Sequence, residues 1–264
     1  MKRLPIACLL VVQIIPVLII FAAAFQPSQL SLGENWDLSQ WGLGHFRRVL
    51  GSDNFLSHLS LSTQIALGSA TLSVFGATLA AYALVYGRFP GLRFFRGSVF
   101  VARMMPPAAL ILPIFLLLRT SGLADTVVGL ILAHTAWNLP FGIWLMLPFF
   151  RAIPEEIFQA AQMDGCSYGQ IFRWIMVPLA VPGMVVAFLF CFLMSWNDFL
   201  FSLILGGSQT KTAALVVNGY VAADQISWGP MAASATLILM PAFGLAWFLQ
   251  RHLVEGLAAG SVKG

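Results

Sequence analysis

The sequence predicts an all-α membrane protein with six transmembrane helices. The 264-residue chain is 59% apolar and 9% charged, its mean hydropathy is +0.86, and its apolar residues form long runs. A helix needs about 17–25 apolar residues to cross a bilayer. Six runs reach that length, at about residues 4–25, 59–86, 97–118, 126–150, 179–205 and 228–250. No repeat or linker divides the chain, so we expect residues 1–264 to form one transmembrane domain.

The first apolar run follows two basic residues, Lys2 and Arg3, as in a secretory signal peptide. It is about 21 residues long, whereas the apolar core of a signal is about 7–15 residues. Five further runs follow it. We therefore expect an uncleaved first span.

The second run carries small residues four positions apart, namely Ser69, Ser73, Ala77 and Ala81. Small residues let helix backbones approach closely in lipid, so this row predicts packing against another helix. The segment before it, residues 26–58, is the longest outer connection. Its residues Trp41, Phe46, Val49 and Leu50 predict a short amphipathic helix on the membrane surface.

The third run contains Pro106, Pro107 and Pro113. Proline removes a backbone donor and disturbs the preceding turn, so this span is expected to be kinked. Arg103 precedes the prolines near one end of the span, where its long side chain can reach the membrane surface.

Polar residues interrupt the fourth and fifth runs. His134 and Asn138 lie one helical turn apart on one face, and Asp198 follows Trp196 and Asn197. Polar groups at this depth face the protein interior or a hydrated path. Hydrogen bonding between helices and a place on a solute pathway both fit His134 and Asn138. Asp198 requires a partner or water, because burying an unpaired carboxylate is costly.

The distribution of Lys and Arg predicts that both termini are cytoplasmic. Cytoplasmic connections carry an excess of these residues, and this topology places ten of the fourteen inside. The inner set is Lys2, Arg3, Arg88, Arg93, Arg96, Arg103, Arg151, Arg173, Arg251 and Lys263, and the outer set is Arg47, Arg48, Arg119 and Lys211. Residues 151–178, between the fourth and fifth runs, are then cytoplasmic.

Residues 151–178 are polar and predict two short helices. Pro154 suits a first helical position, and Glu155 and Glu156 follow it, where carboxylates complement the positive helix end. Gly165 ends this helix. Ser167 and Gln170 then have the spacing of a capping box that opens a second helix. An interfacial amphipathic hairpin is the alternative interpretation of this pattern.

This segment resembles the "EAA" loop in permease subunits of bacterial binding-protein-dependent ABC importers, in particular the MalG-type branch for sugars. The matching residues are Gln159, Ala160, Ala161, Asp164, Gly165, Ile175, Val177, Pro178, Pro182 and Gly183. Gln159 stands where glutamate is usual. Residues 44–50 and the Trp196-Asn197-Asp198-Phe199 stretch also resemble the sugar-transporting branch, so the likeness covers most of residues 44–205.

The resemblance implies the type I ABC importer permease fold and the function of a sugar or oligosaccharide importer in the inner membrane. It implies a second permease subunit, two ATP-binding cassette subunits that bind ATP and Mg²⁺, and an extracytoplasmic solute-binding protein. The ATPase contact would involve Glu155, Glu156, Gln159, Ala160, Ala161, Asp164, Gly165, Ile175 and Pro178. The solute pathway would involve His134, Asn138, Trp196, Asn197 and Asp198. Membrane lipid surrounds such a subunit, and no cofactor is expected in this chain.

Other functions have less support in the residues. Gly206–Thr212 resembles a phosphate-binding loop, but Thr210 replaces its second glycine. Metalloprotease and nucleophile-elbow motifs are missing, so we expect no catalytic site. Cys8, Cys166 and Cys191 lack paired spacing, which predicts free thiols and no metal site. No basic run interleaves with aromatic residues, which argues against nucleic-acid binding. A permease for polyamines or amino acids, or a self-sufficient transporter, remains an alternative.

Overall fold

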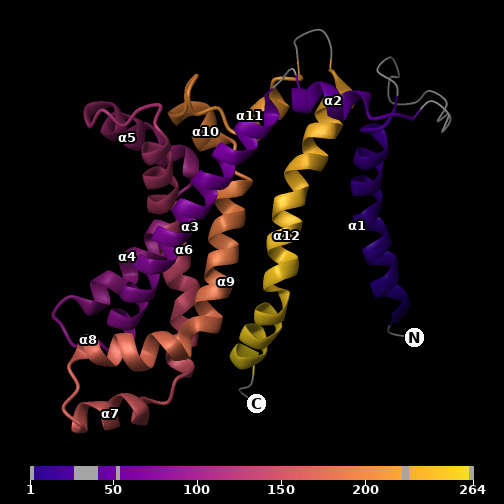
Figure 1. Cartoon of the computed structure of the whole chain (residues 1–264). Helices are drawn as coiled ribbons and strands as arrows, with labels where there is room; N and C mark the ends of the chain where they lie inside the picture. The colour runs from indigo at the N-terminus through magenta and orange to yellow at the C-terminus, as the bar shows by residue number, and fades with distance from the viewer. Residues whose placement is uncertain (1–2, 27–40, 52–53, 222–225, 262–264) are drawn as a thin grey trace. The chain divides into compact units, whose positions relative to one another are not determined.

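The structure of the chain is a computed structural model. It describes residues 3–26, 41–51, 54–221 and 226–261, without the side chains of 3–11 and 251–261. Helices make up nearly all of the described chain (Figure 1), and its one strand-like pairing is an isolated bridge between Val221 and Ile226. The all-α prediction is therefore confirmed.

Four described helices are long and apolar enough to cross a membrane. These are α3 (Phe55–Tyr86), α6 (Val127–Ala152), the continuous stretch Tyr168–Trp196, and residues Trp228–Gln250 of α12 (Trp228–Ser261). The first predicted run coincides with α1 (Arg3–Ala23). Two further helices, Leu92–Met104 and Pro107–Thr120, occupy the third predicted run. Each of the six predicted runs thus contains a helix, and the count of six spans stays a prediction.

The third predicted span, 97–118, is two helices. They are α4 (Leu92–Met104) and α5 (Pro107–Thr120), and they meet at an angle of 102°. A kink at these prolines was expected, and the break occurs there, although no bend of this size was predicted. Met105 and Pro106 each precede a proline and adopt extended backbone, with ψ of 131° and 140°. Proline disfavours helical backbone in the preceding residue, which explains the break.

The boundaries predicted for the fifth span, 179–205, also change. The helix begins in α8 (Tyr168–Ile171), continues through a π-helical turn at Phe172–Met176, and ends as α9 (Val177–Trp196). After three residues, the separate helix α10 (Leu200–Leu205) begins. The predicted run 179–205 combined α9 and α10 into one span because both helices are apolar.

The contacts divide the chain into two compact units, Met1–Ser62 with Lys211–Phe243, and Thr63–Thr210 with Gly244–Gly264. In the first unit, α2 (Gly44–Gly51) and α11 (Ala213–Asn218) contribute Val49, Ala213 and Val216 to a core around Phe55. The short helix predicted from Trp41, Phe46, Val49 and Leu50 is confirmed, and it begins at Gly44, after Trp41. His45 of α2 lies so close to Gly229 that any side chain at position 229 would clash with it, and burial lowers the pKa of His45.

The second unit is built on a close approach of helices. Ser69, Ser73, Ala77 and Ala81 of α3 are all completely buried, as their spacing predicted. A Cβ atom at Gly142 of α6 would lie 3.0 Å from the Ala77 side chain, so glycine is needed where these helices cross. Figure 1 shows the loop helices α7 and α8 at one end of this unit and α5 and α10 at the other.

Candidate functional site

The loop at one end of the second unit folds as the sequence predicted. Its first helix, α7, spans Glu155–Met163, with Glu155 and Glu156 in the first turn. Pro154 is the residue before the helix, one position earlier than expected. Ser167 opens α8 with a complete capping box: its amide donates to Gln170 Oε1 (2.8 Å), and its hydroxyl accepts from the Gln170 amide (3.4 Å).

Gly165 makes the turn between these helices. Its φ is +83°, a conformation that glycine adopts without steric cost. The amides of Gly165 and Cys166 donate to the carbonyls of Gln162 and Ala161, each at 3.0 Å. This pair of bonds is the Schellman arrangement that closes helix ends. A Cβ atom at position 165 would meet nothing within 4 Å, so the backbone conformation alone requires glycine.

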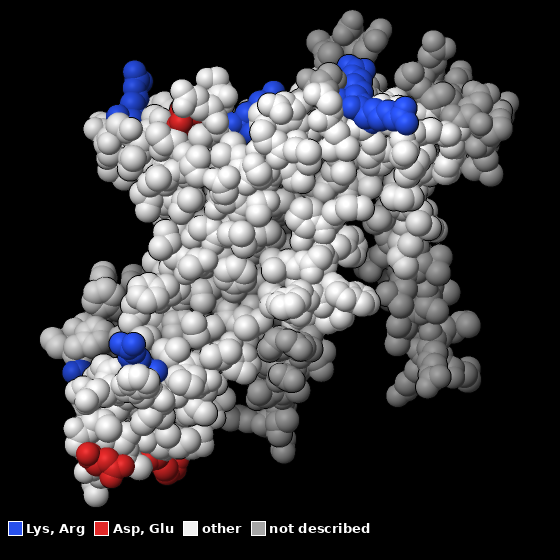
Figure 2. Space-filling view, viewed as in Figure 1, with Lys and Arg blue, Asp and Glu red and all other residues white. Residues whose placement is uncertain are grey.

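Most of α7 is exposed. Glu155, Glu156, Gln159, Ala160 and Asp164 are exposed, and Figure 2 shows acidic side chains gathered at the end of the unit that α7 forms. The Gln159 amide donates to Glu155 Oε1 at 3.2 Å, so it is held along the helix surface. The loop therefore presents an ordered, polar face to the outside of the subunit.

Some residues predicted for this face lie elsewhere. Ala161 is 5% exposed, so its small side chain packs within the subunit. Ile175 lies in the π-helical turn and is half-buried, and Pro178 is exposed at the start of α9. The exposed face is thus formed by α7 and Gly165, with Pro178 on the neighbouring helix.

Aromatic residues attach α7 to the rest of the unit. Phe158, 6% exposed, stacks on Tyr86 of α3, with ring centroids 4.7 Å apart, and contacts Tyr168 of α8 at 5.5 Å. The Tyr86 hydroxyl donates to the Phe150 carbonyl (2.8 Å), and the Tyr82 hydroxyl donates to the Tyr168 carbonyl (3.0 Å). Sequence analysis missed this cluster, although Phe158 is the one aromatic residue of α7.

A second group of polar side chains lies in the interior between α3, α6 and α9. Asn138 Nδ2 donates to Ser195 Oγ at 2.8 Å and to the Cys191 carbonyl at 3.2 Å. Ser195 Oγ also lies 2.7 Å from Ser69 Oγ. Helix–helix hydrogen bonding, one of the two interpretations of Asn138, is therefore present.

His134 and Asp198 continue this polar group. His134 Nε2 lies 3.7 Å from Asp198 Oδ2, with side chains 2% and 18% exposed. Neither His134 Nε2 nor Asn138 Oδ1 has a hydrogen-bond partner among the described residues. Asp198 Oδ2 accepts hydrogen bonds from the amides of Phe201 (3.0 Å) and Ser202 (3.2 Å), so its carboxylate caps α10.

The three consecutive residues at the end of α9 have different surroundings. Trp196 is 4% exposed and stacks on Phe192, Asn197 is exposed, and Asp198 is half-buried. The structure therefore joins His134, Asn138 and Asp198 in one group, while Trp196 packs on Phe192 and Asn197 is exposed. No cluster of three potential metal-binding side chains occurs in the described part of the chain.

Residues 71–258 match the model of the family described as "Binding-protein-dependent transport system inner membrane component". The chain belongs to this family. The permease is 35% identical to the trehalose transport system permease protein SugB of Mycobacterium tuberculosis, over 95% of this chain and 93% of that protein. It is 30% identical to the diacetylchitobiose uptake system permease protein DasC of Streptomyces coelicolor, over 95% and 92% of the two chains.

The fold of the permease is also that of solved importers. It matches a chain of a bacterial ABC transporter that imports the polysaccharide alginate with a TM-score of 0.77, at 20% identity, over 96% of this chain and 97% of that chain. A chain of the methionine transporter MetNI matches with a TM-score of 0.61, at 16% identity, over 78% and 98%. The predicted family and importer fold are thereby confirmed.

A further site in the permease, around Asp125, was not predicted. Asp125 precedes α6 with φ of +54° and binds the segment 206–210. Its carboxylate accepts from the Thr210 hydroxyl (2.7 Å) and from the amides of Thr210 (3.1 Å) and Gln209 (3.3 Å). The Thr210 hydroxyl bond is the main cause that lowers the pKa of Asp125. The segment that resembled a phosphate loop is therefore occupied by an acidic side chain.

Proposed function

We propose that the permease is the membrane subunit of an ATP-driven importer for a sugar or oligosaccharide. Relatives that align along nearly the whole chain carry names for trehalose, diacetylchitobiose and maltodextrin transport. The family description supports a partner binding protein. By this proposal a second permease subunit completes the path, two separate subunits bind ATP and Mg²⁺, and this chain binds no cofactor and catalyses no reaction.

The exposed face of α7 is the observation that supports coupling to an ATPase. It joins Glu155, Glu156, Gln159 and Ala160 on one helix, with Asp164 at the C-cap of that helix. We place this face, with residues 151–178 and both termini, in the cytoplasm because of the distribution of Lys and Arg. Closure of the ATPase pair would then move α7 and change the packing of the spans.

A larger side chain on the exposed face of α7 tests the proposed coupling to an ATPase. Ala160→Leu is expected to lower solute-stimulated ATP hydrolysis and co-purification of the ATPase subunits, because it adds bulk to the docking face and leaves the interior unchanged. Ser121→Leu places the same bulk on an exposed residue at the other end of the unit and is the control. Equal coupling in both variants would contradict docking through α7.

The substrate class requires uptake measurements with the complete importer. Uptake of labelled disaccharides, amino acids and polyamines, each competed with unlabelled solute, is expected to show saturable uptake of a saccharide. Saturable uptake of an amino acid or a polyamine instead would overturn the sugar assignment without affecting the transport function.

The interior polar group is the proposed part of the solute pathway in this subunit. His134 Nε2 and Asn138 Oδ1 are buried and lack hydrogen-bond partners among the described residues, which suits hydroxyl groups of a saccharide. Asp198 caps α10 and has the role of positioning this group, and Trp196 and Asn197 precede it at the end of α9. Asp198→Asn, which retains a capping oxygen, should preserve assembly and uptake better than Asp198→Leu. Equal uptake in both variants would exclude this role.

A further inference from the structure

The attachment of α7 to the second unit is concentrated in very few side chains. Among the residues of α7, Phe158 and Ala161 are buried. Ala161 has a single side-chain carbon and little surface with which to hold a neighbour. Phe158 is therefore the main side chain that binds this helix to the elements around it.

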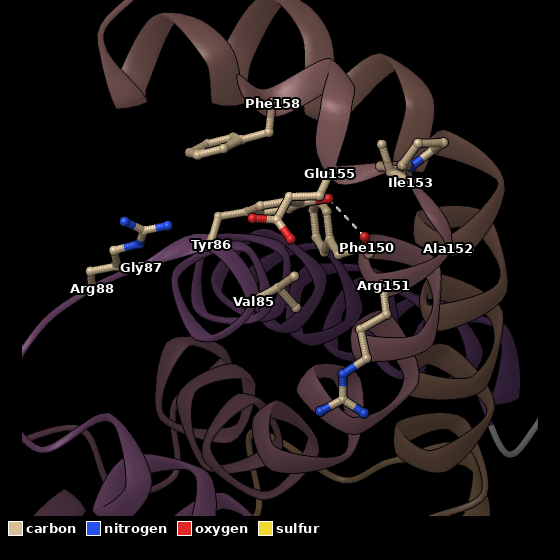
Figure 3. A pocket seen from close by; sticks show the side chains of 11 residues that line it. Val85, Tyr86, Gly87, Arg88, Phe150, Arg151, Ala152, Ile153, Glu155 and Phe158 are labelled. Carbon is tan, nitrogen blue, oxygen red and sulfur yellow. Dashed lines mark hydrogen bonds between the residues drawn. The ribbon is translucent and has the colours of Figure 1, made fainter. Parts of the chain in front are cut away.

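A cavity beneath the first turn of α7 strengthens this conclusion. It has a volume of about 500 Å³ and is lined by Tyr86, Arg88, Phe150, Arg151, Glu155 and Phe158, among others. Figure 3 shows the Phe158 ring reaching from α7 toward Tyr86, with Glu155 beside the open space. Beside this open space, the Phe158 ring reaches Tyr86 of α3, with ring centroids 4.7 Å apart.

The partner of Phe158 is itself firmly held. Tyr86 is 8% exposed, and its hydroxyl is bonded to the end of α6 through the Phe150 carbonyl. One turn earlier on α3, Tyr82 is bonded to the start of α8 through the Tyr168 carbonyl, and its ring lies 5.0 Å from Phe172. The inner end of α3 is thus bonded to both chain segments that flank α7.

We propose that Phe158, Tyr86 and Tyr82 form an aromatic joint through which a movement of α7 is transmitted to α3. Helices α6 and α9 are continuous in the chain with residues 153–167, whereas α3 is held to this segment and its flanks by these rings, by the hydrogen bond from the Tyr82 hydroxyl to α8, and by the hydrogen bond from the Tyr86 hydroxyl to the end of α6. Phe158 is the positioning residue of the joint, and α3 moves together with α7. This inference rests on the proposed coupling to an ATPase.

Substitutions of Phe158 in the complete importer test the joint. Phe158→Ala is expected to abolish most solute-stimulated ATP hydrolysis and uptake, while the ATPase subunits still co-purify because the exposed face of α7 is unchanged. Phe158→Tyr retains the ring and should therefore keep the coupling that Phe158→Ala loses. Phe55→Ala removes a fully buried ring from the other unit and controls for general loss of packing: it should leave the ratio of uptake to ATP hydrolysis unchanged.

A cross-link gives a readout that loss of folding cannot imitate. In a chain with Cys8, Cys166 and Cys191 replaced, cysteines at positions 158 and 86 should uncouple transport. Joining them with a short, reducible bis-methanethiosulfonate should restore coupling, and reduction should abolish it again. The opposite result would be transport by the variant with free thiols and loss of transport after cross-linking. It would mean that α7 and α3 must move separately, and it would refute the joint. If the parent importer shows no solute-stimulated hydrolysis, the proposed function fails instead.

Discussion

Gly165 shows how one backbone angle can determine the shape of the loop formed by residues 151–178. Its φ of +83° is unfavourable for residues with a Cβ atom, but a Cβ atom placed at this position would meet no other atom within 4 Å. Gly165→Ala is therefore expected to destabilise the turn by about 1 kcal/mol, without a clash. Hydrogen exchange of the α7 and α8 amides measures this opening. Gly165→Asn should cost less because asparagine tolerates this conformation, so equal exchange in the two variants would contradict the explanation.

Asp125 holds the segment 206–210 as an ionised carboxylate. Because hydrogen bonds lower the pKa of Asp125, the ionised form stabilises the folded segment. This contribution is complete above the usual carboxyl pKa of 3.8 and is lost as the pH falls through the lower pKa of the folded state. Asp125→Asn keeps the size of the side chain and is expected to speed hydrogen exchange at Thr210 at pH 7.

The difference in hydrogen exchange between wild type and Asp125→Asn should depend on pH, and this dependence tests the explanation. Wild type and Asp125→Asn should approach the same exchange protection only as the pH falls through the pKa of the folded carboxyl, which lies below its usual value of 3.8, because the wild-type carboxyl becomes protonated there. Thr210→Val, which removes the hydroxyl donor, should weaken the segment at neutral pH as well. A difference between wild type and Asp125→Asn that persists unchanged into acid would exclude the ionised carboxylate as its cause.

At the scale of elements, hydrogen bonds between Asn138, Ser195 and Ser69 connect three helices. Hydrogen bonds between membrane helices contribute about 0.6 kcal/mol on average and up to about 1.7 kcal/mol. The combination of Asn138→Leu and Ser195→Ala is thus expected to show a coupling energy of that size in a double-mutant cycle. Unfolding in mixed micelles measures it. Strict additivity of the two substitutions would mean that this bond does not stabilise the packing of α6 on α9.

The helices were predictable where local chemistry determines them. Ser167 and Gln170 identify the start of α8, and Gly165 the end of α7, because caps depend on residues a few positions apart. The small residues of α3 likewise identified its packing face. The bend between α4 and α5 was not predictable in size, since prolines mark a break but do not give the direction of the next helix.

The candidate site was predictable from the sequence only where it depends on residues close together in the chain. The polar face of α7 followed from its own sequence, whereas the stacking of Phe158 on Tyr86 joins residues far apart in the chain. Composition could not separate Ala160, which is exposed, from Ala161, which is buried. The capping of α10 by Asp198 was missed because its position in an apolar run suggested a single continuous span.

For the whole molecule, the predicted topology places both termini and residues 151–178 in the cytoplasm. In a cysteine-free background, a cysteine at position 167 should react with an impermeant maleimide only after the membrane is opened, because Ser167 is exposed on the inner side. A cysteine at Ser121, which is also exposed, should react in intact cells. Labelling of position 167 from outside would reverse the topology and remove the proposed ATPase contact.

The exposure of α7 has a consequence for the life of the subunit in the cell. Apolar Met163 is 89% exposed and Ile157 is 38% exposed on a helix held mainly by one ring. A copy that lacks its ATPase partners therefore displays a short, easily opened helix with apolar side chains, the kind of segment that proteases cleave first. We expect such unassembled copies to be degraded faster than assembled ones, so that the helix proposed to contact the ATPase would also keep the numbers of the subunits matched.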